Sequence, residues 1–242
     1  MGKAKASRKQ PRINYNKTNV VNINTFQKKK TVVTILPRNK NQETYVLKLL
    51  EPGKDIVFGI GPAGTGKTLL AVQVAVKSFK EGLVDKIIVT RPAVSVDEDL
   101  GALPGTLEQK MAPWTRPIFD VLREYFDNRE IEGMIEEGII EIAPLSYMRG
   151  RTFKNAYIIA DEMQNATPNQ MKMLLTRLGE NSYMAVTGDL FQADRLNDNG
   201  LVDFLGHLKD RPTTRIDVVN FEKKDVERHE AVKEVLEVYG DE

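Results

Sequence analysis

The stretch Gly61-Pro62-Ala63-Gly64-Thr65-Gly66-Lys67-Thr68 matches the pattern G-x-x-x-x-G-K-[ST] of a phosphate-binding loop. The apolar residues 56–60 before it predict a buried strand, and residues 69–77 after it favour a helix. In this setting the glycines let backbone N–H groups face phosphate oxygens, and the helix dipole adds to the attraction. We therefore expect the loop to bind nucleotide phosphates, with Lys67 on the β- and γ-phosphates and Thr68 on Mg²⁺. The alternative is a glycine-rich turn with an incidental lysine.

The rest of the chain continues to alternate strands with helices. Further strands are expected at 85–90, 139–142, 156–160, 183–187 and 215–219. Helices are expected at 106–127, where Pro113 and Pro117 should kink or divide the helix, at 167–178 behind a capping box, after Asp198, and from Asp225 onward. Residues 93–105 read as a long loop. Because the strands are apolar without alternation, we predict an α/β fold with a central, mostly parallel sheet and helices on both faces.

Composition excludes several classes of protein. The chain of 242 residues has no cysteine and two histidines, which excludes a disulfide framework and leaves no plausible zinc site. We find neither a membrane-spanning run nor the apolar region of a secretory signal, so we expect a cytoplasmic protein that does not enter a membrane.

Charge is distributed unevenly along the chain. Residues 1–40 hold eleven of the 35 Lys and Arg residues and none of the 34 Asp and Glu residues, so this part carries +11 and the remainder −10. We interpret 1–21 as a basic, disordered arm and 22–242 as one domain. The arm is either a binding segment for RNA or DNA phosphates or a solubilising tail that attracts the acidic body of a neighbouring subunit.

Two acidic residues follow the expected strand at 156–160. Asp161-Glu162 has the form of a Walker B motif, in which the first carboxylate holds Mg²⁺ near Thr68 and the second accepts a proton from the attacking water. The alternative is a charged turn. In a parallel sheet the carboxyl ends of the strands share one edge, which would bring this pair to the phosphate loop.

Amide side chains near strand ends are candidates for sensing the γ-phosphate. Gln192, just after Gly188-Asp189, can hydrogen-bond the γ-phosphate or the lytic water, unless it belongs to an ordinary polar turn. Gln164 is a second candidate of this kind. Gln42 can pair with both edges of adenine, although an isolated glutamine is otherwise a surface residue.

Four arginines invite a functional interpretation. Arg228 falls in the first turn of the expected terminal helix, against the helix dipole, and is either an arginine finger or an exposed residue paired with Glu222 or Asp225. The other three are candidates for binding a nucleic-acid backbone, with surface ion pairs as the alternative: Arg91, Arg149 and Arg151.

Several blocks of sequence together resemble the PhoH family of phosphate-starvation-associated ATPases. They run in order from about Gln42 to Val235 and comprise residues 58–68, Val89-Thr90-Arg91-Pro92, Leu103-Pro104-Gly105, residues 148–153, Asp161-Glu162-Met163-Gln164-Asn165 and Thr187-Gly188-Asp189. One departure is Trp114, which stands where the family more often has tyrosine.

The resemblance implies a single RecA-like ATPase domain, related to superfamily 1 helicase cores, that uses ATP and Mg²⁺ and assembles into hexameric rings. By position, it implies that Gln42 reads adenine, that Asp189 with Gln192 forms the sensor, and that Arg228 is the terminal arginine. A lone domain with a basic arm would suit a bacteriophage or short bacterial version.

Two classes of function remain open. The first is an Mg²⁺-dependent ATPase that acts on single-stranded RNA or DNA, in the manner of a helicase, as a homo-oligomer. The second is an ATP-switched clamp for nucleic acid or protein without motor activity. Glu162 favours turnover, because a positioned carboxylate is what hydrolysis needs.

Overall fold

The computed structural model describes residues 32–92, 107–192, 198–228 and 230–239, and the statements below concern these residues. The basic arm predicted at 1–21, its boundary with the domain and the long loop predicted at 93–105 lie outside the described residues.

Six strands of the described chain form one sheet in the order β3-β2-β4-β5-β1-β6, and every neighbouring pair is parallel. The strands are β1 (Ile56–Ile60), β2 (Lys86–Thr90), β3 (Ile140–Ile142), β4 (Ala156–Ala160), β5 (Tyr183–Gly188) and β6 (Ile216–Asn220). Ile60 pairs with Gly188 and Thr90 with Ala160, so the carboxyl ends of four central strands meet at one edge. This confirms the predicted α/β fold and places the loops after β1, β4 and β5 side by side.

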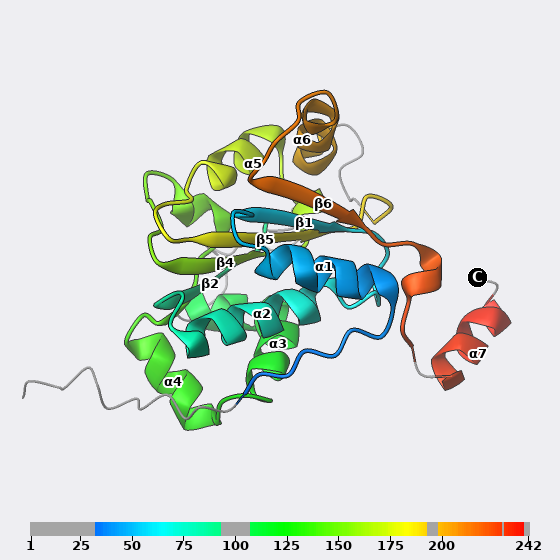
Figure 1. Cartoon of the computed structure of the whole chain (residues 1–242). Helices are drawn as coiled ribbons and strands as arrows, with labels where there is room; N and C mark the ends of the chain where they lie inside the picture. Colours follow the sequence, from blue (N-terminus) through cyan, green and yellow to red (C-terminus); the bar gives the residue numbers. More distant parts are fainter. Residues whose placement is uncertain (1–31, 93–106, 193–197, 229, 240–242) are drawn as a thin grey trace, which may run out of the picture. The chain divides into compact units, whose positions relative to one another are not determined.

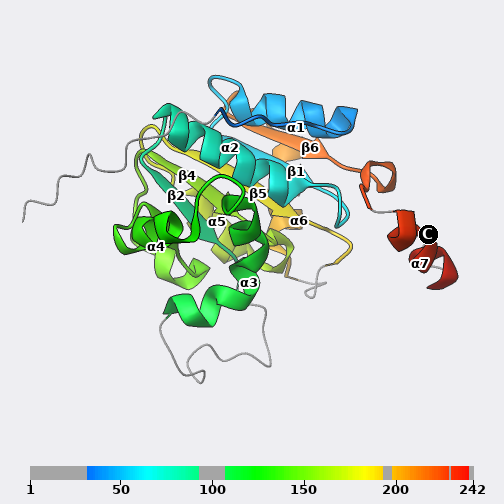
Figure 2. The ribbon, with the colours of Figure 1, turned by 90° about the horizontal axis from the view of Figure 1, so that it is seen from below.

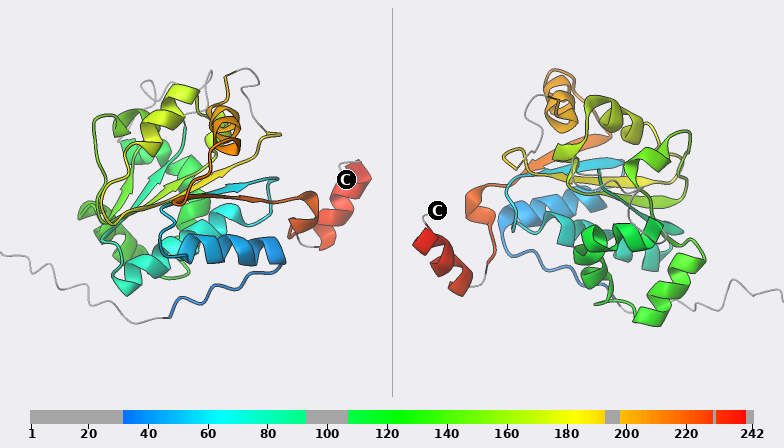
Figure 3. Two further views of the ribbon diagram at one scale, coloured as in Figure 1. Left: turned by 45° about the horizontal axis from the view of Figure 1, so that its top comes forward. Right: turned by 180° about the vertical axis from the view of Figure 1, so that it is seen from behind.

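Helices cover both faces of the sheet (Figures 1, 2 and 3). One face carries α1 (Lys40–Leu50), α2 (Lys67–Glu81), α3 (Leu107–Leu122) and α4 (Asn128–Glu136), and the other carries α5 (Pro168–Leu175) and α6 (Gly200–Lys209). Each layer has its own apolar core: Leu122 and Ile131 belong to the first, Met171 and Leu201 to the second. Strands that are apolar on both sides therefore bury both sets of side chains, as the sequence pattern indicated.

The helix α5 shows why a local signal can be reliable. Thr167 Oγ1 accepts a hydrogen bond from Gln170 N at 3.2 Å, and Gln170 Oε1 accepts one from Thr167 N at 2.9 Å. Pro168 occupies the first helical position, where a missing N–H costs nothing. The predicted capping box is confirmed.

Other helix boundaries correct the sequence predictions. The cap of α6 is Asn199, whose side chain accepts from Leu201 N and Val202 N, and not Asp198. The helix α3 runs through Pro113 and Pro117 without division. The helices α1 and α4 were not predicted at all, although the Asn39 cap of α1 and the capping box of α4 are visible signals.

The last predicted helix begins later than expected. Asp225 ends a short 3-10 turn, η4 (Lys223–Asp225), and the helix α7 (Glu230–Tyr239) starts at Glu230. Arg228 therefore precedes the helix, and the argument that it opposes the helix dipole is wrong. None of the described helices is long and apolar enough to span a membrane.

Candidate functional site

The phosphate loop lies between β1 and α2, as predicted, with Lys67 as the first residue of α2. Lys67 Nζ donates to the carbonyl oxygens of Gly61 at 2.6 Å and Pro62 at 2.7 Å. The loop forms one side of a cavity of about 240 Å³. This cavity is lined by Ala63, Gly64, Gly66, Lys67, Thr68, Leu69, Glu162, Thr187, Gly188, Asp189 and Gln192. The structure thus brings together residues that the sequence placed on three separate loops.

Lys67 is a buried cation among carboxylates. Its burial lowers the pKa of the ammonium group below the ordinary value, and Asp189, Glu162 and Asp161 oppose that shift. Burial disfavours the charged form, whereas nearby negative charges favour it. An anionic phosphate in the cavity would add a further charge that favours the ammonium form.

Asp161 connects three elements through one carboxylate oxygen. Its Oδ1 accepts from Thr68 Oγ1 at 2.7 Å and from Thr187 Oγ1 at 2.6 Å, and the residue is 5% exposed. Mg²⁺ prefers oxygen ligands and is usually held by one or two carboxylates with substrate phosphates completing its shell. Thr68 and Asp161 bring two such oxygen ligands together at the cavity, which fits a site that is shared with substrate phosphates.

Glu162 adopts an uncommon backbone conformation. Its φ of 54° and ψ of 40° place it in the left-handed region, which costs a residue with a Cβ roughly 1–2 kcal/mol. The residue lines the cavity together with residues of the phosphate loop. Strain of this kind is common where a side chain is aimed at a site, which agrees with the predicted role of Glu162.

Asp189 and Gln192 form a turn after β5. Asp189 Oδ1 accepts from Phe191 N at 2.9 Å, and Gln192 N donates to Asp189 O at 3.3 Å. Both residues line the cavity, Asp189 buried and Gln192 exposed. The turn therefore places Gln192 at the cavity, while its sensing role stays a prediction.

Gln42 lies on α1 behind the phosphate loop. Its Nε2 donates to Thr65 O at 3.0 Å, and its Oε1 accepts from Arg38 N at 2.8 Å. The side chain is 4% exposed, so it is not the surface residue of the alternative interpretation. Each end of the amide keeps one more hydrogen-bonding position, and adenine reading stays a prediction.

Arg228 lies beside the phosphate loop of its own chain. Glu227 N donates to Gly64 O at 3.0 Å, and a Cβ atom at Gly64 would be 3.2 Å from Arg228 Nε. Gly64 also has a φ of 82°, which favours glycine. Within the described residues, the alternative partners of Arg228 bind other groups: Glu222 forms an ion pair with Lys224, and Asp225 accepts a hydrogen bond from Asn41.

The segment that carries Arg228 is tied to α1. Asp225 Oδ2 accepts from Asn41 Nδ2 at 2.7 Å and from Glu222 N at 2.8 Å, and Asp225 is 3% exposed. Asn39 Nδ2 donates to Asp225 O at 3.3 Å. These bonds fix residues 222–228 against the start of α1, next to the phosphate loop.

The three candidate nucleic-acid arginines occupy different surroundings. Arg91 is half-buried just after β2, at the edge of the sheet that carries the cavity. Arg149 is exposed and caps the 3-10 turn η2 (Leu145–Met148). Arg151 forms a two-pronged ion pair with Glu141 and lies over the Phe153 ring at 4.6 Å. For Arg151 the structure therefore supports the alternative interpretation, a surface ion pair.

Sequence reasoning missed two contributors to this site. Thr187 donates to Asp161, and the sequence marked it only as the end of a strand and as part of the block Thr187-Gly188-Asp189, without a role. Asn41 holds Asp225 over a separation of 184 residues, for which the sequence offers no local signal.

Known proteins resemble both the sequence and the fold. A chain of the HK97 bacteriophage large terminase superposes with a TM-score of 0.53 at 15% identity, covering 86% of this chain and 48% of that one, which shows the fold alone. A PhoH-like protein of Bacillus subtilis is 47% identical over 208 residues, which are 85% of this chain and 64% of the relative. Protein PhoH of Escherichia coli K12 is 44% identical over 210 residues, 85% of this chain and 58% of the relative.

The chain spans less than two thirds of the length of these curated relatives. The family model for PhoH-like proteins matches residues 34–240, which include the phosphate loop, the Asp161-Glu162 pair and Arg228. The parallel sheet, the phosphate loop and these matches together show that the chain belongs to the PhoH-like protein family.

Proposed function

We propose that the protein binds and hydrolyses ATP with Mg²⁺ in the cavity at the carboxyl edge of the sheet. The observation that carries the proposal is the convergence of Lys67, Thr68 and Glu162 on one cavity, with Asp161 hydrogen-bonded to Thr68. Lys67 would exchange its carbonyl partners for phosphate oxygens, and Glu162 would orient and deprotonate the attacking water. Mg²⁺, when bound by Thr68 and Asp161, supplies charge neutralisation at the phosphates.

Lys67→Ala tests the phosphate-binding half of the proposal. Without the ammonium group, affinity for ATP and hydrolysis should both collapse, because the cation that pairs with the β- and γ-phosphates is gone. Binding of a fluorescent ATP analogue and phosphate release are the measurements, and Lys154→Ala, an exposed lysine paired with Glu180, is the control. Unchanged ATP affinity in Lys67→Ala would place the nucleotide elsewhere.

We further propose that hydrolysis is coupled to single-stranded RNA or DNA, as in a helicase. What supports this is the charge of +11 over residues 1–40, together with Arg91 at the edge of the sheet and exposed Arg149. Stimulation of phosphate release by a panel of RNA and DNA strands tests the coupling. No stimulation by any strand would favour the alternative, an ATP-switched clamp without motor activity.

The arm makes a prediction of its own. Affinity for a single strand should fall by about 0.7 log units per log unit of salt for each phosphate contact. Deleting residues 1–30 should therefore flatten the salt dependence of binding, measured by fluorescence anisotropy. A slope that does not change would leave the arm with a solubilising role.

A further inference from the structure

Gln164 lies at the centre of the short turn η3 (Met163–Asn165), two residues after Glu162, and is 1% exposed. Its Nε2 donates to Glu162 Oε2, and its Oε1 accepts from the backbone N–H of Asp189 at 3.1 Å. A Cβ atom at Gly188 would be 3.2 Å from the same Oε1, so the amide is tightly packed against the end of β5. One buried side chain thus connects the carboxylate after β4 with the turn after β5.

The chemistry of the two partners fixes the orientation of this amide. A backbone N–H can only donate, so the Gln164 oxygen must face Asp189. The NH₂ group then points to Glu162, which accepts the hydrogen bond as a carboxylate. Because Glu162 has a left-handed backbone, its carboxylate is not held in place by a regular strand or helix, and Gln164 supplies a fixed contact.

We propose that Gln164 is a positioning residue that holds the Glu162 carboxylate in its place for hydrolysis and links it to the Asp189–Gln192 turn. The inference rests on the proposed function, in which Glu162 activates the attacking water. It replaces the expectation that Gln164 itself senses the γ-phosphate, since Gln164 is 1% exposed and is not one of the residues that line the cavity. A displacement of Glu162 would then also move the turn that carries Gln192, and a displacement of that turn would move Glu162.

The test is a double-mutant cycle between Gln164→Ala and Glu162→Gln, measured as kcat and KM for ATP in the full chain. A misplaced catalytic group can cost on the order of 10²-fold, so Gln164→Ala should lower kcat by roughly 10- to 100-fold with little change in KM. In the Glu162→Gln background the same substitution should change kcat by less than about twofold, because residues that act as a unit are not additive.

Two further variants separate positioning from loss of structure. Gln164→Met keeps the length of the side chain and fills its space if Gln164→Ala does not fold, and it should show the same fall in kcat. Gln170→Ala removes the side chain that completes the capping box of α5, and it should lower the thermal midpoint of unfolding without lowering kcat.

Equal falls in both backgrounds, or a loss that appears only in KM, would overturn the role of Gln164. Wild-type kcat in folded Gln164→Met would do the same. If the wild-type chain itself released no phosphate from ATP under any condition, the proposed function would fail, and with it the role assigned to Gln164. The wild-type measurement therefore tells the two failures apart.

Discussion

Tyr45 is fully buried under the sheet, and within the described residues its hydroxyl has no hydrogen-bond partner. A Cβ atom at Gly59 in β1 would be 2.8 Å from Tyr45 Cζ, so the ring fills the space that this glycine leaves. Burial, and to a smaller extent Asp161, raises the pKa of Tyr45 well above its ordinary value. The residue therefore stays neutral, and the packing of its ring offsets the free-energy cost of the unpaired hydroxyl.

Tyr45→Phe should leave the free energy of unfolding unchanged or raise it by about 1 kcal/mol, because an unpaired buried hydroxyl costs about 1–3 kcal/mol in desolvation. Urea unfolding measures the difference. Gly59→Ala is the matched packing control and should destabilise the protein, since its methyl group would overlap the Tyr45 ring. A clear loss of stability in Tyr45→Phe would mean that the hydroxyl has a partner.

At this scale the sequence predicts chemistry better than geometry. The identities of Lys67, Asp161 and Glu162 follow from motifs, because a phosphate loop needs particular groups at particular spacings. The partners of Gln42 and Gln164 could not be predicted, since an amide offers donors and acceptors that only tertiary contacts select.

The hydrogen bond between Asn41 and Asp225 connects α1 to residues 222–228, and removing it tests what this connection contributes. Asn41→Ala removes the donor at 2.7 Å from the buried Asp225 carboxylate. Hydrogen bonds to charged groups are worth about 1.5–3 kcal/mol, so the free energy of unfolding should fall by about that much. KM for ATP should rise as well, because the same segment holds Arg228 beside Gly64.

The control for Asn41→Ala is Thr44→Ala on the same helix. Thr44 is partly exposed, and its hydroxyl donates only to Lys40 O, so stability and KM should stay close to the wild-type values. If the two variants behaved alike, the contact with Asp225 would contribute nothing to either property.

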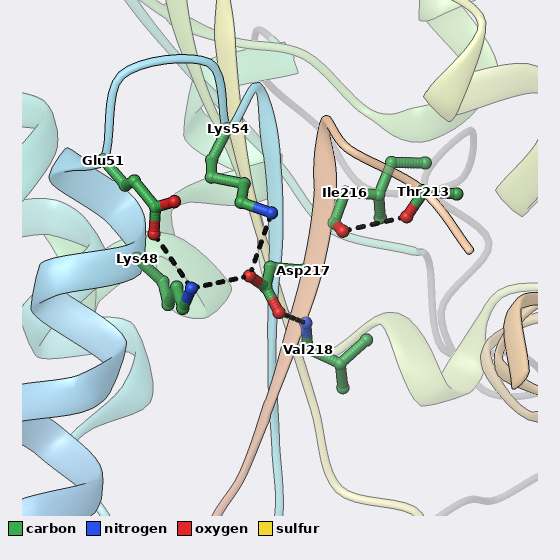
Figure 4. Close-up of polar contacts among 7 residues, drawn as sticks. All are labelled: Lys48, Glu51, Lys54, Thr213, Ile216, Asp217 and Val218. Carbon is green, nitrogen blue, oxygen red and sulfur yellow. Dashed lines mark hydrogen bonds and ion pairs between the residues drawn. The ribbon is translucent and has the colours of Figure 1, made fainter.

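A second connection joins α1 to β6 through ion pairs (Figure 4). Asp217 Oδ2 lies 3.1 Å from Lys48 Nζ and 3.3 Å from Lys54 Nζ. Partial burial raises the pKa of Asp217, but hydrogen bonds from Lys48, the backbone N–H of Val218 and Lys54 outweigh it, so the pKa lies below its ordinary value of 3.8.

Because the folded-state pKa is lowered, the stabilisation from Asp217 is present above pH 3.8 and is lost as the pH falls through the folded-state value. Asp217→Asn should thus lower the free energy of unfolding near pH 7 by less than about 1 kcal/mol, as expected for a partly exposed network. The difference from wild type should vanish in strong acid. A difference that grew towards low pH would contradict this assignment.

Predictions of helices and strands succeeded where no tertiary contact overrides the local sequence pattern. The apolar strands and the capping box of α5 are examples, and the parallel sheet followed from them. The start of α7 was predicted at Asp225, an apparent cap, because the sequence does not reveal that its side chain is already bound by Asn41 and Glu222. The fold could be predicted, therefore, but not the contacts that delimit its last helix.

At the scale of the whole molecule, the sheet carries the proposed nucleotide cavity at one edge, which would form one wall of the site. We propose a homo-oligomer, with a hexameric ring as the favoured form, in which a second copy supplies the other wall. The position of Arg228 beside its own phosphate loop supports an action on the nucleotide of the same chain, whereas the need for a second wall predicts an arginine finger that acts on a neighbour's nucleotide.

Mixed assemblies distinguish these two actions of Arg228. If Arg228 acts on a neighbour, inactive Arg228→Ala and Lys67→Ala chains should regain part of the phosphate release when mixed, since intact sites form between unlike copies. If Arg228 acts within its chain, rings that are shown by mass to be mixed should stay inactive. The mass of the wild type in ATP, measured first, must exceed that of one chain for either result to apply.

The central claim is that this chain hydrolyses ATP with Glu162 as the residue that activates water. The most direct measurement is phosphate release from ATP and Mg²⁺ by the wild type and by Glu162→Gln, together with ATP affinity and with Glu180→Gln as an exposed carboxylate control. We predict that Glu162→Gln binds ATP as tightly as the wild type but releases phosphate on the order of 10²-fold more slowly, within the range typical of general-base catalysis. Equal rates in wild type and Glu162→Gln, or no phosphate release by the wild type, would contradict the claim.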